Sequence, residues 1–267
     1  MFNLDIAKKF GVAAVLTGAV AAASAGPTFT INRNHLTGLA QSSVVGDSFG
    51  TSGATRAVLS NAYGSGAGTV AGNGWISFDT VKLNGVTVGG SGIGGTWAMW
   101  AEFSFNMTLI AGGLGAPGSD YAINSVSMTL YGEGLLDASN AVFNAGDTAT
   151  NPSVTVPTDR VTLGTGVFNF GAAGINVGGG SSFNPTMYFT LANPDGPQVF
   201  TAPVPFFPLA FASLTNDIGG ISGQGTQNLH LLTGGTASFQ LPEPTALALV
   251  GLALVGAGVA SRRQLRK

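Results

Sequence analysis

The stretch Thr96-Trp-Ala-Met-Trp-Ala-Glu-Phe-Ser-Phe-Asn-Met-Thr108 divides into two sets of side chains at alternate positions. A period of two is typical of a β-strand, in which neighbouring side chains point to opposite faces. We expect the first set to face the core: Trp97, Met99, Ala101, Phe103, Phe105 and Met107. We expect the second set to face water: Ala98, Trp100, Glu102, Ser104, Asn106 and Thr108.

The same period recurs along the chain. Within 123–131, one face is predicted to carry Ile123, Ser125, Ser127, Thr129 and Tyr131, and the other Asn124, Val126, Met128 and Leu130. Further strands are predicted at 74–82, 160–170, 184–191, 206–214 and 236–241. Glycine-rich stretches separate these runs, and no amphipathic helical pattern interrupts them. The predicted fold class is all-β, with a single β-sandwich or jelly-roll-like body over residues 26–241.

Composition limits the possible chemistry. Only 8% of the residues are charged, whereas about 25% is usual, and 42 of the 267 residues are glycine. A chain that is poor in charge and 45% hydrophobic does not have the composition of a disordered protein. The absence of cysteine excludes thiol catalysis, disulfides and cysteine-based metal centres. We expect no cofactor and no metal site.

The net charge of −2 conceals an uneven distribution. Six of the ten basic residues lie near the two ends, so the stretch 26–241 keeps four basic and ten acidic residues. This acidic body has no basic patch that would neutralise phosphate groups. We therefore expect no nucleic-acid partner.

The first 25 residues have the pattern of a secretory signal peptide. Lys8 and Lys9 precede a short apolar run over 10–22, and small residues occupy Ala23 and Ala25 before Gly26. This order predicts a signal helix and cleavage after Ala25 by signal peptidase, following export by the secretion machinery. A transmembrane anchor is the alternative, which the short run and the good cleavage site make less favourable.

The last 26 residues, 242–267, form a second pattern in three parts. Pro242, Glu243 and Pro244 come first, an apolar run follows over 245–260, and the end is basic through Arg262, Arg263, Arg266 and Lys267. As a helix the apolar run would measure roughly 24 Å, slightly less than a hydrocarbon core of about 30 Å. The basic end would stay in the cytoplasm by the positive-inside rule. A plain single-pass anchor is the alternative.

This three-part tail resembles the PEP-CTERM sorting domain. The resemblance implies recognition and removal of the tail by a membrane-embedded exosortase, in Gram-negative bacteria that make exopolysaccharide. It also implies that the inner membrane holds the protein only transiently, before it reaches the cell surface or the extracellular matrix.

Three short segments are similar to the flocculation-associated PEP-CTERM proteins: Phe29-Thr-Ile-Asn32, the stretch 200–216, and Thr236-Ala-Ser-Phe-Gln240. Proteins of that family help cells to aggregate in flocs. The resemblance implies a non-catalytic surface or matrix protein that supports flocculation or biofilm formation with exopolysaccharide.

Two stretches of the sequence match catalytic or cofactor-binding motifs. Gly46-Asp-Ser48-Phe-Gly50 fits the G-x-S-x-G turn of serine hydrolases, so a secreted hydrolase using Ser48 is one alternative function. No convincing helix follows this motif, as that turn requires, and only His35 and His230 could act as the base. The stretch 90–95 fits G-x-G-x-x-G, but a strand rather than a helix is predicted next, so we interpret it as a hairpin or loop.

A carbohydrate-binding module is the other alternative. Trp100 is predicted on the water-facing side of its strand, where it could stack on a sugar ring of a glycan. Large aromatic side chains are usually buried, so a covering loop or second layer over Trp100 is the competing interpretation.

Overall fold

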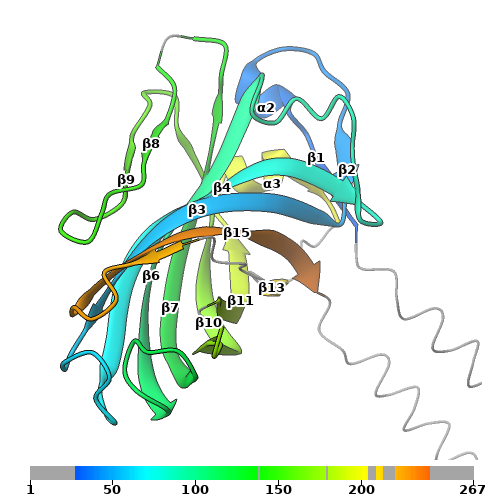
Figure 1. Ribbon diagram of the computed structural model, residues 1–267. Helices are drawn as coiled ribbons and strands as arrows, with labels where there is room; N and C mark the ends of the chain where they lie inside the picture. Colours follow the sequence, from blue (N-terminus) through cyan, green and yellow to red (C-terminus); the bar gives the residue numbers. More distant parts are fainter. Residues whose placement is uncertain (1–27, 138, 179, 204–208, 213–219, 241–267) are drawn as a thin grey trace, which may run out of the picture. The chain divides into compact units, whose positions relative to one another are not determined.

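The computed structural model describes residues 28–137, 139–178, 180–203, 209–212 and 220–240 (Figure 1). These residues belong to one compact unit, Pro27–Gln240. The predicted signal helix and tail helix lie outside the described residues. Within the described part of the chain, no helix is both long and apolar enough to cross a membrane.

The body is all-β, as predicted, with two short helices, α2 (Asn34–Thr37) and α3 (Asp195–Val199). The strands are β1 (Phe29–Ile31), β2 (Val44–Gly46), β3 (Ser48–Leu59), β4 (Thr69–Leu83), β5 (Val86–Thr87), β6 (Trp97–Ala111), β7 (Ser119–Gly134), β8 (Val142–Asn144), β9 (Ser153–Thr155), β10 (Val161–Ile175), β11 (Ser181–Leu191), β12 (Phe200–Ala202), β13 (Leu209–Ala212), β14 (Gly220–Ser222) and β15 (Asn228–Gln240). Each predicted strand overlaps an observed one. The strands that were not predicted are the long strand β3 and the short strands β1, β2, β5, β8, β9, β12 and β14.

The long strands form one antiparallel sheet of ten strands in the order β13-β11-β10-β7-β6-β4-β3-β15-β14, with β5 beside β4. Strand β13 pairs with β11 on one side and with β15 on the other, so the sheet closes on itself. Without β5 and β14, eight strands make up this closed ring. The sandwich or jelly-roll expectation is therefore corrected: one curved sheet encloses the core, because a closed sheet buries its inner face without a second layer.

Strand β6 has the predicted inner face. Trp97, Met99 and Ala101 are almost completely buried, and Phe103, Phe105 and Met107 continue the same row into the interior. Trp100 is the exception on the opposite face, because it is also completely buried. A period of two thus identified the strand and its inner face correctly, whereas it failed for the outer face at this residue.

Strand β7 departs from strict alternation through a β-bulge. Asn106 of β6 pairs with Ser125, while the next residue, Met107, pairs with Ile123, which leaves Asn124 as the extra residue. A bulge shifts the pleat by one residue, so side chains beyond it change face. Ile123 therefore points inward together with Val126, and the predicted grouping of Ile123 with the serines of this strand is wrong.

Aromatic rings inside the sheet lie opposite glycines of the neighbouring strand. Gly72 pairs with Phe105 and Gly74 with Phe103 across β4 and β6. A Cβ atom on Gly72 would come within 2.6 Å of Cζ of Phe105 and within 2.5 Å of the carbonyl oxygen of Arg56. The phenylalanine rings occupy the space that side chains at these glycines would need.

One end of the closed sheet is covered by the N-terminal segment (Figure 1). The Phe29 ring of β1 stacks on Phe49 at 4.7 Å, and Phe49 meets Phe78 edge to face at 5.0 Å. Leu36 of α2 lies against Gly132 of β7, where a Cβ atom would come within 3.0 Å of its side chain. The three-stranded sheet β12-β1-β2 holds this covering segment in place.

Gly72→Ala is expected to lower the free energy of unfolding by about 1–3 kcal/mol, because the added methyl group overpacks the space filled by Phe105. In a domain of this size each kcal/mol lowers Tm by about 2–4 °C. Thermal unfolding followed by circular dichroism measures the change. Gly66→Ala is the matched control, since a Cβ atom there meets nothing within 4 Å. Equal Tm values for the two variants would contradict the expected overpacking.

Candidate functional site

The residues predicted for sorting and processing lie outside the described part of the chain. They are Ala23, Ala25 and Gly26 at the signal cleavage site, Pro242, Glu243 and Pro244 in the sorting motif, and Arg262, Arg263, Arg266 and Lys267 in the basic end. The described strands begin at Phe29 and end at Gln240. These sites therefore remain predictions from the sequence.

Trp100 does not offer a sugar-binding surface, because its side chain is 0% exposed. Its ring lies 5.6 Å from Tyr131 of β7 and 6.1 Å from Phe143, measured between ring centroids. Phe143 belongs to the separate hairpin β8–β9, and it also packs on Trp75 of β4 at 4.8 Å. The hairpin is the covering layer that the competing interpretation required, so the predicted glycan contact at Trp100 is corrected.

Polar contacts fix this aromatic cluster to the sheet. The indole Nε1 of Trp75 donates a hydrogen bond to the carbonyl oxygen of Asn144 at 2.8 Å, and Nε1 of Trp100 donates to Glu102 at 3.3 Å. The Arg160 guanidinium lies 4.2 Å from the centroid of the Tyr131 ring, a cation–π contact. The cluster thus holds the hairpin on the outer face of the sheet.

Ser48 begins strand β3 rather than a strand-to-helix turn, and its hydroxyl donates a hydrogen bond to Asp47 at 2.7 Å. His230 donates through Nε2 to the carbonyl oxygen of Ala145 at 2.8 Å. Ser48 pairs with Ser238 of β15, eight residues from His230 along that strand, which is roughly 26 Å at about 3.3 Å per residue. The structure therefore does not bring Ser48 and His230 together.

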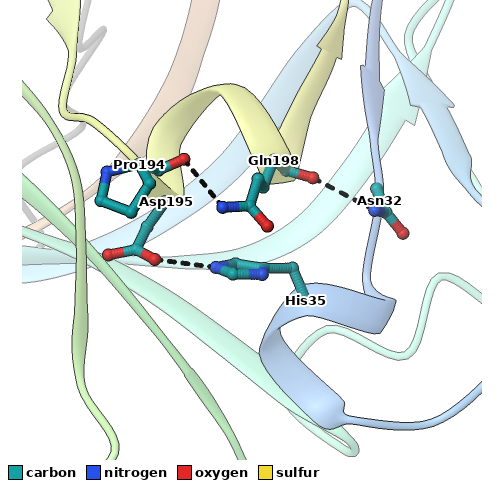
Figure 2. A network of polar contacts seen from close by, with 5 residues as sticks. All are labelled: Asn32, His35, Pro194, Asp195 and Gln198. Atoms are coloured by element: carbon teal, nitrogen blue, oxygen red, sulfur yellow. Dashed lines mark hydrogen bonds and ion pairs between the residues drawn. The ribbon is translucent and has the colours of Figure 1, made fainter.

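His35 belongs to a polar network that joins the N-terminal segment to α3 (Figure 2). Its Nε2 atom lies 2.8 Å from Oδ1 of Asp195. Beside it, the Asn32 side chain donates to the carbonyl oxygen of Gln198 at 3.1 Å, and the Gln198 side chain donates to that of Pro194 at 3.2 Å. No hydroxyl nucleophile takes part in these contacts, so the network is a structural link between α2 and α3.

The stretch 90–95 is a loop, as predicted, and a buried arginine anchors it. Nη1 of Arg33 donates to the carbonyl oxygens of Gly90 at 3.0 Å and Ser91 at 2.7 Å, and Nε donates to that of Ser42 at 3.0 Å. Gly92 has φ of 77°, a left-handed conformation that favours glycine. Backbone carbonyls therefore solvate this buried cation, and two of them, those of Gly90 and Ser91, belong to the loop.

Glu133 is a buried acid whose side chain is only 1% exposed. Burial raises the pKa of Glu133 above its ordinary value of 4.5, and the nearby carboxylates of Asp159 and Asp137 raise it further. The backbone N–H of Ala141 donates to both carboxyl oxygens, at 3.0 and 3.1 Å, and opposes that increase. The described residues contain no group of three or more metal-ligating side chains, so we assign no metal to this cluster.

The interior of the closed sheet contains a cavity that no sequence pattern had indicated. It measures about 70 Å³ as space for the centres of water-sized molecules, and about 670 Å³ as empty space that includes its mouth. Seven strands supply its lining, which is mainly apolar: Thr55, Ala57, Val70, Ile76, Phe103, Phe105, Met107, Tyr121, Ala173, Gly174, Ile175, Ser181, Ser182, Phe183, Leu229, Leu231 and Thr233. This cavity is the candidate binding site of the body.

The sequence could not reveal this site, because the lining residues come together only when the sheet closes. Ser181 stands at the beginning of β11, where a serine is ordinary beside a glycine-rich turn. Phe103, Phe105 and Met107 were predicted only as core residues. The structure adds that their side chains face an empty volume as well as one another.

Glu133→Gln is expected to change how stability depends on pH. The folded-state pKa of Glu133 lies above the unfolded value, so the folded protein binds the proton more tightly than the unfolded chain does. The contribution of this proton to the free energy of unfolding is therefore fully present below about pH 4.5. The free energy of unfolding should therefore fall as the pH rises through the folded-state pKa. A glutamine stays neutral and can still accept from Ala141, so the variant should lose this fall.

Denaturant unfolding between pH 4 and pH 8 measures the effect, and the variant should become more stable relative to the wild type as the pH rises. Glu102→Gln is the matched control, because the Glu102 side chain is 41% exposed. Parallel pH profiles for the wild type and Glu133→Gln would show that burial of Glu133 does not affect stability in this way.

Comparisons with protein-family models, curated proteins and solved structures found no match to this chain. The resemblance to the PEP-CTERM sorting domain therefore rests on residues 242–267 themselves. The function has to be argued from the two end patterns and from the geometry of the body.

Proposed function

We propose that this chain is an exported, non-catalytic protein of the cell surface or extracellular matrix. In this proposal the secretion machinery exports it, signal peptidase removes residues 1–25, and an exosortase removes the tail. The mature body then supports flocculation or biofilm formation together with exopolysaccharide. The apolar run 245–260 would be a transmembrane helix that holds the protein in the inner membrane during sorting.

The observation that carries the proposal is the position of the fold between the two processing patterns. Strand β1 begins at Phe29, three residues after Gly26, and β15 ends at Gln240, with Leu241 alone before Pro242. Removal of both ends would leave every described strand pairing intact. A body whose hydrogen-bonded sheet needs neither end can mature in this way without losing its fold.

The outer face of the sheet supports a role in contact with other surfaces. Val167 of β10 and Tyr188 of β11 are direct cross-strand partners, and both side chains are exposed. Phe170 follows three residues later on β10 and is 59% exposed. An exposed phenylalanine and tyrosine on adjacent strands can stack on sugar rings, and low charge permits close approach of neighbouring molecules. We call Val167, Phe170 and Tyr188 the β10–β11 patch.

This patch also favours the second candidate function, a carbohydrate-binding module. A side chain that stacks on a sugar ring has to be exposed. Phe170 and Tyr188 are exposed on the strand surface, whereas Trp100 is buried. The two functions are compatible, because a matrix protein that binds exopolysaccharide would use such a patch.

Changing Pro242, Glu243 and Pro244 together to alanine is expected to block removal of the tail. Mass spectrometry of protein recovered from cell-surface and medium fractions of an exosortase-containing host measures this. The wild-type protein should begin at Gly26 and lack the basic end, whereas the variant should retain residues through Lys267. Gln264→Ala is the matched control, since it lies in the tail but outside the motif. A wild-type mature form that keeps Lys267 would refute sorting by an exosortase.

The double change Phe170→Ala and Tyr188→Ala is expected to reduce retention on purified exopolysaccharide and cell aggregation severalfold, because each ring removed eliminates a stacking surface. Val177→Ala, at an exposed apolar residue outside the patch, is the matched control. Normal aggregation in a strain that lacks the whole protein would count against the proposed role. Unchanged retention by the double variant would exclude the β10–β11 patch as the contact.

A further inference from the structure

The cavity lies toward the end of the closed sheet that is opposite the covering N-terminal segment. Its lining includes residues near the end of β6, at the beginning of β7, at the end of β10 and at the beginning of β11: Met107, Tyr121, Ile175 and Ser181. Leu36 and Phe29 cover the other end, where β3, β6 and β10 begin. The two ends of the sheet thus differ, because one is filled by side chains and the other contains the cavity.

The chemistry of the lining selects for an uncharged occupant. None of the described lining residues carries a charge, and most of the surface comes from apolar side chains such as Ile76, Phe103 and Phe183. A charged group buried here would lose its hydration without gaining an ion-pair partner, which is strongly unfavourable. An apolar molecule gains from leaving water and from contact with these rings.

One polar group in the lining lacks a partner. Ser181 is 7% exposed, its Oγ atom is buried, and that atom has no hydrogen-bond partner among the described residues. Buried hydroxyl groups in proteins nearly always form hydrogen bonds, so an orphaned one needs an explanation. Ser181 is itself part of the lining and pairs with Ile175, another lining residue, so rotation of its side chain about the Cα–Cβ bond would bring the hydroxyl to a ligand atom that supplies the missing partner.

We infer that this cavity binds a small, uncharged, mainly apolar molecule that carries a single hydroxyl or carbonyl group, with Ser181 Oγ as its hydrogen-bond partner. The volume of about 70 Å³ for the centres of water-sized molecules fits a compact ring or a short chain. Small residues keep the space open: Ala173 lies between Tyr121 of β7 and Phe183 of β11 in the sheet register. This binding does not depend on tail processing or on exopolysaccharide.

The test uses the full chain and three probes with the same ring: benzyl alcohol, toluene and benzoate. Titration calorimetry should detect binding of benzyl alcohol and toluene, with benzyl alcohol several times tighter, and much weaker binding of benzoate. Ser181→Ala should reduce the preference for benzyl alcohol over toluene by about three- to tenfold, which corresponds to one hydrogen bond. Ser104→Ala, which removes a hydroxyl from the outer face of the sheet, should leave the preference unchanged.

A second variant tests the location of the site. Ala173→Leu should weaken both benzyl alcohol and toluene, because the larger side chain occupies the cavity. If calorimetry gives equal binding heats for the wild type and Ala173→Leu, and circular dichroism shows that both proteins are folded, binding in the cavity is overturned. An unchanged preference in Ser181→Ala would overturn the role of Ser181, and this result can be read even if Ala173→Leu fails to fold.

Discussion

The contact between the phenylalanine rings of β6 and the glycines of β4 is the constraint on which the rest of the structure depends. Phe103 and Phe105 point into the closed sheet, and their cross-strand partners are Gly74 and Gly72. Without Cβ atoms at these positions the rings have room inside one curved sheet. A larger residue at either glycine would force the rings or the β3 backbone to move. The same rings then form a wall of the cavity, so core packing and the candidate binding site share the same residues.

The two faces of the sheet have different roles because they are covered differently. The inner face is buried by closure, with the N-terminal segment over one end. On the outer face, the hairpin β8–β9 covers Trp75 and Trp100, while Val167 and Tyr188 remain exposed. Because the hairpin covers only part of this face, Trp100 packs beneath it, whereas Tyr188 and Phe170 are exposed to solvent and to other molecules. The proposed surface role therefore moves from Trp100 to β10–β11.

The proposed function and the cavity concern separate parts of the molecule. Under the proposed function, export and sorting would depend on residues 1–25 and 242–267, and the described strands lie between these two stretches in the sequence. Contact with exopolysaccharide would use the outer face, whereas a small apolar ligand would bind inside. The unpartnered hydroxyl of Ser181 distinguishes this cavity from a simple packing defect, because cavities that stay empty in proteins are lined by apolar groups.

Local patterns were enough to predict an all-β body, the inner face of β6 and the loop at 90–95, because each depends on residues that are near one another in the chain. The closed sheet, the face of Ile123, the burial of Trp100 and the cavity were not accessible in this way. A bulge at Asn124 changes the face of Ile123, and a hairpin more than forty residues away covers Trp100. Ser181 of β11 lines the same cavity as the β6 aromatic residues only because the sheet curves and closes, since β10 and β7 separate the two strands in the sheet order. Alternation records which side of a strand is apolar, but strand order decides what lies against that side.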